Sequence, residues 1–318
     1  MAEAWQWQGI EEMNQEIQLI PGEFCTFNRA LPEELRYPLL RIAATLLLSL
    51  LLLGIATTAP AAAAENQPPL CDTKMDLRPW LQSNSNRLID VCSALINSGQ
   101  VPKPRLAFAY YNRGEAYLIA GRPNLAISDF TMAIAITPTF SDAFNDRGAA
   151  YLLENQPDRA VRDYDRAISL DPLNANALSS RCAVRGEKGD LRNALSDCDA
   201  AIQIKPSFAA ALNNRCEVRA LLGDLDHALA DCNKSIRLEP NNPSYLDIRA
   251  FVHLKARRYD EAIADYNAAL AGIPNLASAL YGRGLAEQAE GNESVAKADI
   301  VRAQTAVPNI EEAFQKSP

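Results

Sequence analysis

Histidine is scarce in this chain of 318 residues, where only His227 and His253 occur. Neither has a serine, cysteine or carboxylate arrangement around it in the sequence that would form a catalytic triad or a metal site. A glycine-rich phosphate loop, an H-E-x-x-H motif and a C-x-x-C motif are also absent, and these are signatures of nucleotide, metalloprotease and dithiol-redox sites. We therefore expect no enzyme activity, cofactor, metal ion or small-molecule substrate.

Runs of lysine and arginine are missing too, and the net charge at pH 7 is −8. Phosphate binding needs a basic face, so nucleic acid is excluded as the expected partner. The remaining composition, 48% hydrophobic and 22% charged, is that of an ordinary globular protein. It argues against wholesale disorder and against a polytopic membrane protein.

One long uncharged stretch, residues 42–64, lies near the N-terminus. Arg36 and Arg41 precede it, its centre is mostly leucine, and it ends in small residues up to Ala64. This order is typical of a secretory signal peptide that is cleaved after Ala64. The alternative is an uncleaved membrane anchor, which would be the chain's only membrane contact.

Residues 1–41 fit both alternatives badly, because seven glutamates stand against three arginines. They are either an N-terminal extension, which a misassigned start codon would explain, or the cytoplasmic tail of an anchored protein. Both alternatives place the rest of the chain outside the cytoplasm, in a periplasm or a thylakoid lumen. Cysteine usage agrees, since Cys25 precedes the apolar stretch and an even set of six follows it, as in proteins of oxidising compartments.

Four kinds of residue recur at one constant interval in the last two-thirds of the chain, with no insertion or deletion between them. Such periodicity indicates a repeat architecture. The arginines are Arg113, Arg147, Arg181, Arg215, Arg249 and Arg283. The aspartates are Asp129, Asp163, Asp197, Asp231, Asp265 and Asp299. The prolines run from Pro138 to Pro308 and the alanines from Ala126 to Ala296.

Each unit is expected to be a helical hairpin. In the first, residues 107–140, we expect a helix over about 107–120, a turn at Gly121 and a second helix over about 124–136. Glycine or asparagine fills the turn position in every unit except one, which has Arg257. Helices of about 13 residues are too short to bury an apolar face alone, so neighbouring hairpins must stack into an all-α array.

A small position is followed by a large position at a fixed distance along each unit, for example Gly114 and Phe130, or Gly148 and Tyr164. With the alanine and proline that follow, this pattern resembles the tetratricopeptide repeat (TPR) family, of a bacterial exported or membrane-anchored type. The resemblance implies a right-handed α-solenoid of helix-turn-helix repeats. Its six repeats would be residues 107–140, 141–174, 175–208, 209–242, 243–276 and 277–310.

The flanks of the array are less regular. Residues 65–106 are expected to be a linker with a degenerate first unit, in which Arg87–Ser98 resembles a second helix and Cys92 takes the large position. Residues 311–318 form a short tail that caps the last hairpin thinly. Because terminal repeats normally need a cap, we expect a partner or self-association at this end.

Repeats three and four have cysteine at both positions, Cys182 with Cys198 and Cys216 with Cys232. In the TPR family these positions touch across the hairpin, which implies two disulfides within repeats. Four reduced core cysteines or a zinc site are the alternatives, and Cys71 and Cys92 remain for a third pair. The arginine and aspartate series are offset by the same distance as the small and large positions. They are expected to form a structural ladder of ion pairs, rather than a stripe for an acidic ligand.

Members of the family usually hold an extended peptide or a partner helix on the concave face, lined by the first helix of each hairpin. The residues expected there are Tyr111, Asn112, Glu115, Asn145, Asn213, Asn214, Asp247, Phe251 and Tyr281. Asparagine amides can bond a peptide backbone without reading its sequence, and aromatic rings supply contact area. A merely solvated surface is the alternative. No lysine or arginine is among them, so the basic clamp for cytosolic heat-shock chaperones is missing.

The sequence thus favours a non-catalytic protein–protein interaction scaffold that binds a peptide or partner protein outside the cytoplasm. Two further hypotheses remain open. One is a holdase or assembly factor for envelope or photosynthetic complexes, and the other is a binding subunit of an enzyme on another chain.

Overall fold

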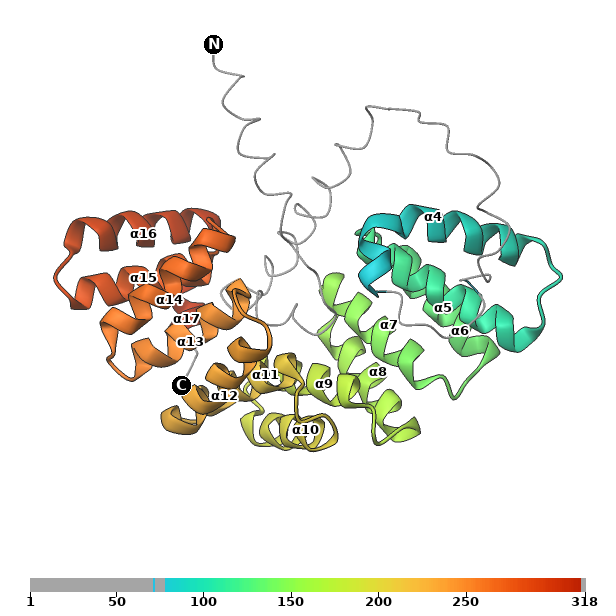
Figure 1. Ribbon diagram of the computed structural model, residues 1–318, viewed down its shortest axis with the longest axis horizontal. Coiled ribbons are helices and arrows are strands. Elements are labelled where there is room, and N and C mark those ends of the chain that lie inside the picture. The colour runs from blue at the N-terminus through green and yellow to red at the C-terminus, as the bar shows by residue number, and fades with distance from the viewer. Residues whose placement is uncertain (1–70, 72–77, 316–318) are drawn as a thin grey trace, which may run out of the picture. The chain divides into compact units, whose positions relative to one another are not determined.

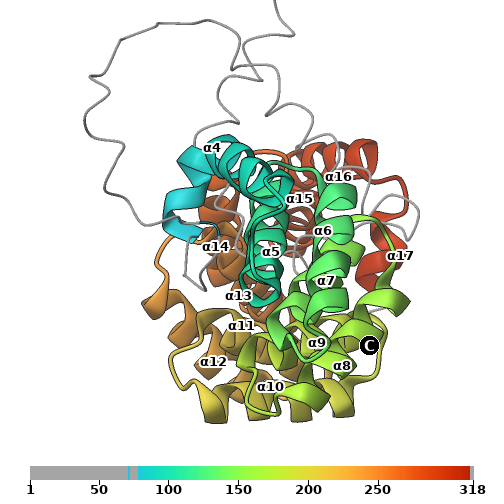
Figure 2. The same ribbon diagram turned by 90° about the vertical axis from the view of Figure 1, so that its right-hand side faces the viewer.

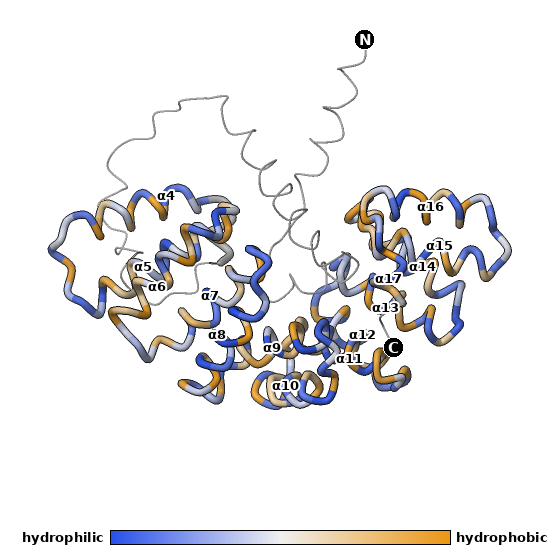
Figure 3. The backbone as a smooth tube through the Cα atoms, turned by 180° about the vertical axis from the view of Figure 1, so that it is seen from behind, coloured by the Kyte–Doolittle hydropathy of each residue, from blue (hydrophilic) through white to orange (hydrophobic). Residues whose placement is uncertain are grey.

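The structure is a computed structural model that describes Cys71 and residues 78–315. The expected N-terminal extension, the signal or anchor segment of residues 42–64 and Cys25 lie outside the described residues. Within residues 78–315, no helix has the length and apolar character needed to cross a membrane. Hydrophobic and hydrophilic residues instead alternate along the helices (Figure 3), as in helices that bury one face.

Helix pairs make up nearly all of the described chain (Figure 1). The first helices of the pairs are α5 (Lys103–Ile119), α7 (Ser141–Leu153), α9 (Ala175–Glu187), α11 (Ala209–Leu221), α13 (Pro243–Lys255) and α15 (Ala277–Ala289). The second helices are α6 (Pro123–Ile136), α8 (Pro157–Leu170), α10 (Leu191–Ile204), α12 (Leu225–Leu238), α14 (Tyr259–Gly272) and α16 (Glu293–Ala306). Helix α4 (Arg78–Asn97) precedes them and α17 (Ile310–Gln315) follows.

The chain divides between Pro172 and Leu173 into two compact units. Of the described helices, the first unit holds α4 to α8 and the second holds α9 to α17. Within each unit, a second helix packs between the first helix of its own pair and that of the next pair. First helices of successive pairs also touch each other, so they form the inner layer of each unit. This arrangement confirms the predicted all-α solenoid of stacked helix pairs.

The turn inside each pair places its central residue in the left-handed region. The backbone angle φ is 67° at Gly121, 80° at Gly189 and 58° at Asn155. Arg257 departs from the pattern in residue type but not in conformation, since its φ is also 58°. The amide of Arg258 then donates to the carbonyl of His253 at 2.9 Å, which closes the helix end in the same way as in the other pairs.

Replacing Arg257 with glycine should therefore stabilise the second unit by about 0.5–1 kcal/mol. A side chain in the left-handed region costs about 1–2 kcal/mol, which exceeds the extra entropy that glycine loses on folding. The shift is measured as a higher midpoint of urea unfolding. Gly223→Ala is the reciprocal control, because φ at Gly223 is 83° and no atom lies within 4 Å of the added methyl group. This variant should have a lower midpoint of urea unfolding. A change of the midpoint in the same direction for both variants would contradict the explanation.

The small and large positions meet inside each hairpin of the core. A methyl group built on Gly114 would lie 2.7 Å from a ring carbon of Phe130, and one on Gly148 would lie 2.7 Å from the ring of Tyr164. Both rings are fully buried. Glycine is thus favoured opposite these rings, because the ring fills the space that a side chain would need.

Both ends of the array extend the helical packing. The stretch Arg87–Ser98 lies in the C-terminal part of α4, except Ser98, and α4 packs on α5 as a second helix would. Helix α5 begins at Lys103, ahead of the expected position 107, because Pro104 lies in its first turn, where a missing amide hydrogen costs nothing. At the other end α17 packs against α15 and α16.

Candidate functional site

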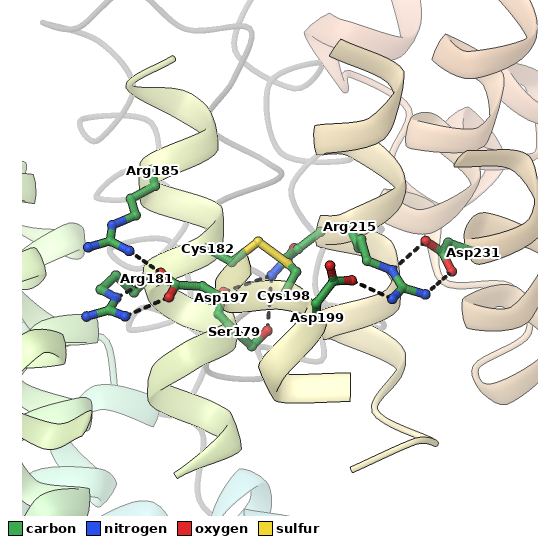
Figure 4. Close-up of a disulfide and its surroundings, with 10 residues drawn as sticks. Ser179, Arg181, Cys182, Arg185, Asp197, Cys198, Asp199, Arg215 and Asp231 are labelled. Carbon is green, nitrogen blue, oxygen red and sulfur yellow. Dashed lines mark hydrogen bonds and ion pairs between the residues drawn. A yellow bond between two sulfur atoms is a disulfide. The ribbon is translucent and has the colours of Figure 1, made fainter. Parts of the chain in front are cut away.

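All three expected cysteine pairs are disulfides. The Cα atoms are 5.5 Å apart in Cys182–Cys198, 5.4 Å in Cys216–Cys232 and 5.3 Å in Cys71–Cys92, and all six side chains are fully buried. Figure 4 shows the first of them bridging the two helices of the third pair. In repeats three and four the cysteines therefore replace a glycine–aromatic contact with a covalent link at the same place in the hairpin.

Arginine and aspartate form the expected ladder. Each guanidinium donates from Nε and Nη2 to the two oxygens of one carboxylate, with N···O distances of 2.6–2.9 Å. The pairs are Arg113–Asp129, Arg147–Asp163, Arg181–Asp197, Arg215–Asp231, Arg249–Asp265 and Arg283–Asp299. The aspartates are only 3–8% exposed. Burial raises the pKa of the Asp129 carboxyl, against the opposite effect of Arg113.

A third contact of the arginines was not foreseen from the sequence. In several repeats the Nη1 atom donates to a polar side chain on the second helix of the preceding pair. Arg215 donates to Asp199 Oδ1 at 2.7 Å, and Arg249 donates to Asn233 Oδ1 at 2.9 Å. Thr131 and Asn267 serve in the same way. These polar residues recur at the same interval as the arginines, so the signal was present. The arginines thus join successive hairpins, which favours the structural interpretation over a stripe for an acidic ligand.

Repeats three and four have an additional arginine beside each disulfide. Arg185 Nη1 donates to Asp197, and Arg219 Nη1 donates to Asp231, both at 2.7 Å (Figure 4 draws the first). The fifth repeat has His253 at this position, 3.8 Å from Asp265. Burial lowers the pKa of His253, and the charge of Asp265 opposes that shift. These positions are occupied by tyrosine in the first two repeats, and sequence reasoning did not connect them with the aspartates.

The nine residues expected to line the inner face all lie on first helices. All are buried except Glu115, which is partly exposed. Several bond to a neighbouring first helix. The Tyr111 hydroxyl donates to Asp146 Oδ2 at 2.6 Å, and the Ser278 hydroxyl donates to Asp247 Oδ2 at 2.7 Å. Burial and the charge of Asp146 raise the pKa of Tyr111. Part of the expected lining therefore joins the helices to one another.

The asparagines of the inner layer differ in how their amides are used. Asn112 Nδ2 donates to the carbonyl of Cys71 at 2.9 Å, and Asn214 Nδ2 donates to Ser179 Oγ at 3.2 Å. Asn145 Nδ2 donates to Asp146 Oδ1 at 2.9 Å. Asn213 is fully buried, but neither its Nδ2 nor its Oδ1 has a hydrogen-bond partner among the described residues. Its donor and its acceptor are therefore both unused among the described residues.

Two further residues of the nine expected on the inner face are aromatic, and both contact a residue that was not among the nine. Phe251 of α13 and Tyr281 of α15 both lie against Phe314 of α17, which the sequence placed in a tail.

Comparison with known proteins agrees with this geometry. Residues 109–140 and residues 141–174 each match the tetratricopeptide repeat family. These two stretches are therefore similar to tetratricopeptide repeats. TPR arrays are protein–protein interaction scaffolds and are typically non-catalytic. No curated protein is similar enough in sequence to match the chain.

Solved structures share the fold. The Cut9–Hcn1 hetero-tetramer of APC/C has a chain with a TM-score of 0.66 and 17% identity, and the match covers 76% of this chain and 48% of that one. The present chain thus spans about half the length of that relative. PilF of Pseudomonas aeruginosa has a TM-score of 0.54 and 22% identity, with 68% and 99% covered. PilW, described as a type IV pilus biogenesis factor, has a TM-score of 0.55 and 19% identity, with 66% and 97% covered.

Proposed function

We propose that this TPR protein is a non-catalytic scaffold that binds a peptide or a partner protein on the inner layer of first helices, outside the cytoplasm. The observation that carries the proposal is the unused amide of Asn213. A buried polar group without a partner costs about 1–3 kcal/mol and is normally satisfied by ordered water or by a bound molecule. A bound peptide would complete the hydrogen bonds of this amide where it reaches the enclosed Nδ2 and Oδ1 atoms of the inner layer. A peptide backbone offers one acceptor and one donor, which matches the two free positions of the amide.

The proposed compartment is supported by the three disulfides. Buried disulfides persist in oxidising compartments and are rare where thiol reductants are maintained. The expected signal or anchor segment would deliver the array to a periplasm or a thylakoid lumen. The likeness to PilF and PilW concerns the fold alone and is not used to choose between a periplasm and a thylakoid lumen.

Asn213→Leu should separate binding from stability. The substitution removes the unsatisfied amide, so the free energy of unfolding should stay level or rise by about 1 kcal/mol. The variant should no longer recover the partner protein in affinity capture from the native host. Asn214→Leu is the matched control. Its amide bonds to Ser179 in the second unit, so its removal should lower stability. Retention of the same partner by Asn213→Leu would contradict the proposed site.

The identity of the captured proteins distinguishes the remaining hypotheses. One stoichiometric protein favours a scaffold, or a binding subunit if that protein is an enzyme. A spread of unfolded clients favours a holdase or assembly factor.

A further inference from the structure

Carboxylates gather around one tyrosine on the inner layer of the first unit. The Tyr111 hydroxyl of α5 donates to Asp146 Oδ2 of α7 at 2.6 Å. Burial has the largest effect in raising the pKa of this hydroxyl, and the charges of Asp146, Glu115 and Asp142 raise it further. Helices α5 and α7 touch each other, and the first unit is drawn on the side that faces the viewer in Figure 2. The inner layer is therefore acidic where these two helices meet.

Asn145 adds a buried acceptor to this group, which we call the acidic cluster: Tyr111, Glu115, Asp142, Asn145 and Asp146. The Nδ2 atom of Asn145 donates to Asp146 Oδ1 at 2.9 Å, which fixes the orientation of the amide. Asn145 is only 5% exposed, and its Oδ1 atom has no hydrogen-bond partner among the described residues. Because a carbonyl oxygen can only accept, this atom calls for a donor from a bound molecule or from water.

The repeat series places no cation at the positions from which the acidic cluster comes. These are the positions of Phe108, Tyr111, Asn112 and Glu115, which recur in the first helix of every repeat. No repeat has lysine or arginine at any of them. Within the described residues, the His, Cys, Asp and Glu side chains also form no group that could hold a metal ion. Charge complementarity therefore favours an organic cation on the partner.

We propose that the acidic cluster binds the side chain of an arginine carried by the partner peptide. A guanidinium group is a donor only and has several N–H bonds in one plane, so it can donate to Asn145 Oδ1 and to neighbouring carboxylates at once. It is also more weakly hydrated than an ammonium group, which suits an enclosed ion pair. The inference rests on the proposed binding function and names one group that the partner carries.

The length of an arginine side chain fits the burial of the cluster. Glu115 is its partly exposed member, whereas Tyr111, Asn145 and Asp146 are buried. A long side chain can approach past Glu115 and bring its charged tip to the enclosed acceptors. Its methylene groups then lie against apolar surface such as the Tyr111 ring, as the stems of long cationic side chains commonly do.

The test follows the full chain by NMR while a short glycine–serine peptide with one central arginine and blocked ends is added. The side-chain amide signals of Asn145 should shift on binding. The matched probe is the same peptide with citrulline in place of arginine, which keeps the shape of the side chain and loses its charge. It should bind at least about tenfold more weakly, because hydrogen bonds between charged groups contribute more than neutral ones. Equal affinities, or no shift with either peptide, would overturn the proposal.

Glu115→Gln tests whether the arginine binds at the acidic cluster. The variant keeps the shape of the side chain and removes one carboxylate, so the arginine peptide should bind about tenfold more weakly. Asp165→Asn is the matched control, because it removes the same charge from an exposed position on the second helix α8 of the same unit. Its affinity should equal that of the wild type. Equal losses in the two variants would indicate attraction by the overall charge and would overturn the proposed site.

Circular dichroism shows whether both variants are folded, and the comparison of the two peptides on the wild type needs no variant at all. The peptide assay also needs no native partner and concerns the first unit. The capture experiment concerns Asn213 of α11 in the second unit. Failure of the arginine site is therefore distinguishable from failure of the proposed function.

Discussion

Replacing Asp231 with alanine should lower the free energy of unfolding of the second unit by about 3–5 kcal/mol, the range for removing one partner of a buried ion pair. Asp231 accepts hydrogen bonds from Arg215 Nε and Nη2 and from Arg219 Nη1, at 2.6–2.7 Å. Its loss leaves two guanidinium groups without the carboxylate that compensated for their burial. The measurement is urea unfolding followed by circular dichroism, with hydrogen exchange in α11 and α12 as the local readout.

Asp199→Ala is the matched control for this prediction. Asp199 binds the same Arg215 at a similar distance, 2.7 Å, but its side chain is 51% exposed, against 7% for Asp231. An exposed pair contributes about 0–1 kcal/mol because water screens it and the side chains lose entropy. Equal losses for the two variants would show that burial does not set the energy of the ladder.

Reduction of the disulfides in repeats three and four should also lower the stability of the protein strongly. Each bridge joins cysteines with a sequence separation of 16, and closing a loop of that length stabilises a protein by about 3 kcal/mol in the chain-entropy model. The wild type should therefore unfold at a clearly lower urea concentration in the presence of a reductant. The second unit should account for most of this change, since it contains both bridges.

A variant that restores the contact of the other hairpins provides the control. Cys216→Gly/Cys232→Phe recreates the pair seen at Gly114 and Phe130, and its fourth hairpin should respond no longer to reductant. Alkylation tests the same bonds in protein from the native host. If Cys182, Cys198, Cys216 and Cys232 all react after denaturation without reductant, the oxidised state and the proposed compartment both fail.

The fold was predictable because the repeat constrains each position in the same way. A glycine opposite an aromatic ring, a left-handed residue in the turn and an aspartate at a fixed distance after an arginine each have a local physical reason. The left-handed turn residue and the arginine–aspartate pair recur in all six repeats, and the glycine–ring pair recurs in the first two, so the same signal is repeated along the chain. The paired cysteines followed from the same positions. Arg257 shows the strength of the constraint, since the chain adopts the left-handed turn there despite the unfavourable residue.

The candidate site was predictable only in part. The sequence indicated that Tyr111 and Asp247 face inward, but it could not say that each bonds to the adjacent first helix. Such bonds depend on the distance and rotation between helices of different repeats. The same limit applies to Asn213 and Asn214, neighbours of one residue type, of which one is paired and one is not.

The amino-acid sequence by itself determined the helical hairpins, their number, the ion-pair partners and the cysteine pairs, because these depend on contacts that recur at fixed separations within and between repeats. Only the tertiary structure decided what happens between hairpins and at the end of the array. The third contact of the arginines outside repeat three, the unused amide of Asn213 and the contacts of Phe314 with Phe251 and Tyr281 all depend on how neighbouring helices pack. That packing depends on two surfaces that face each other, and each repeat supplies only one of the two.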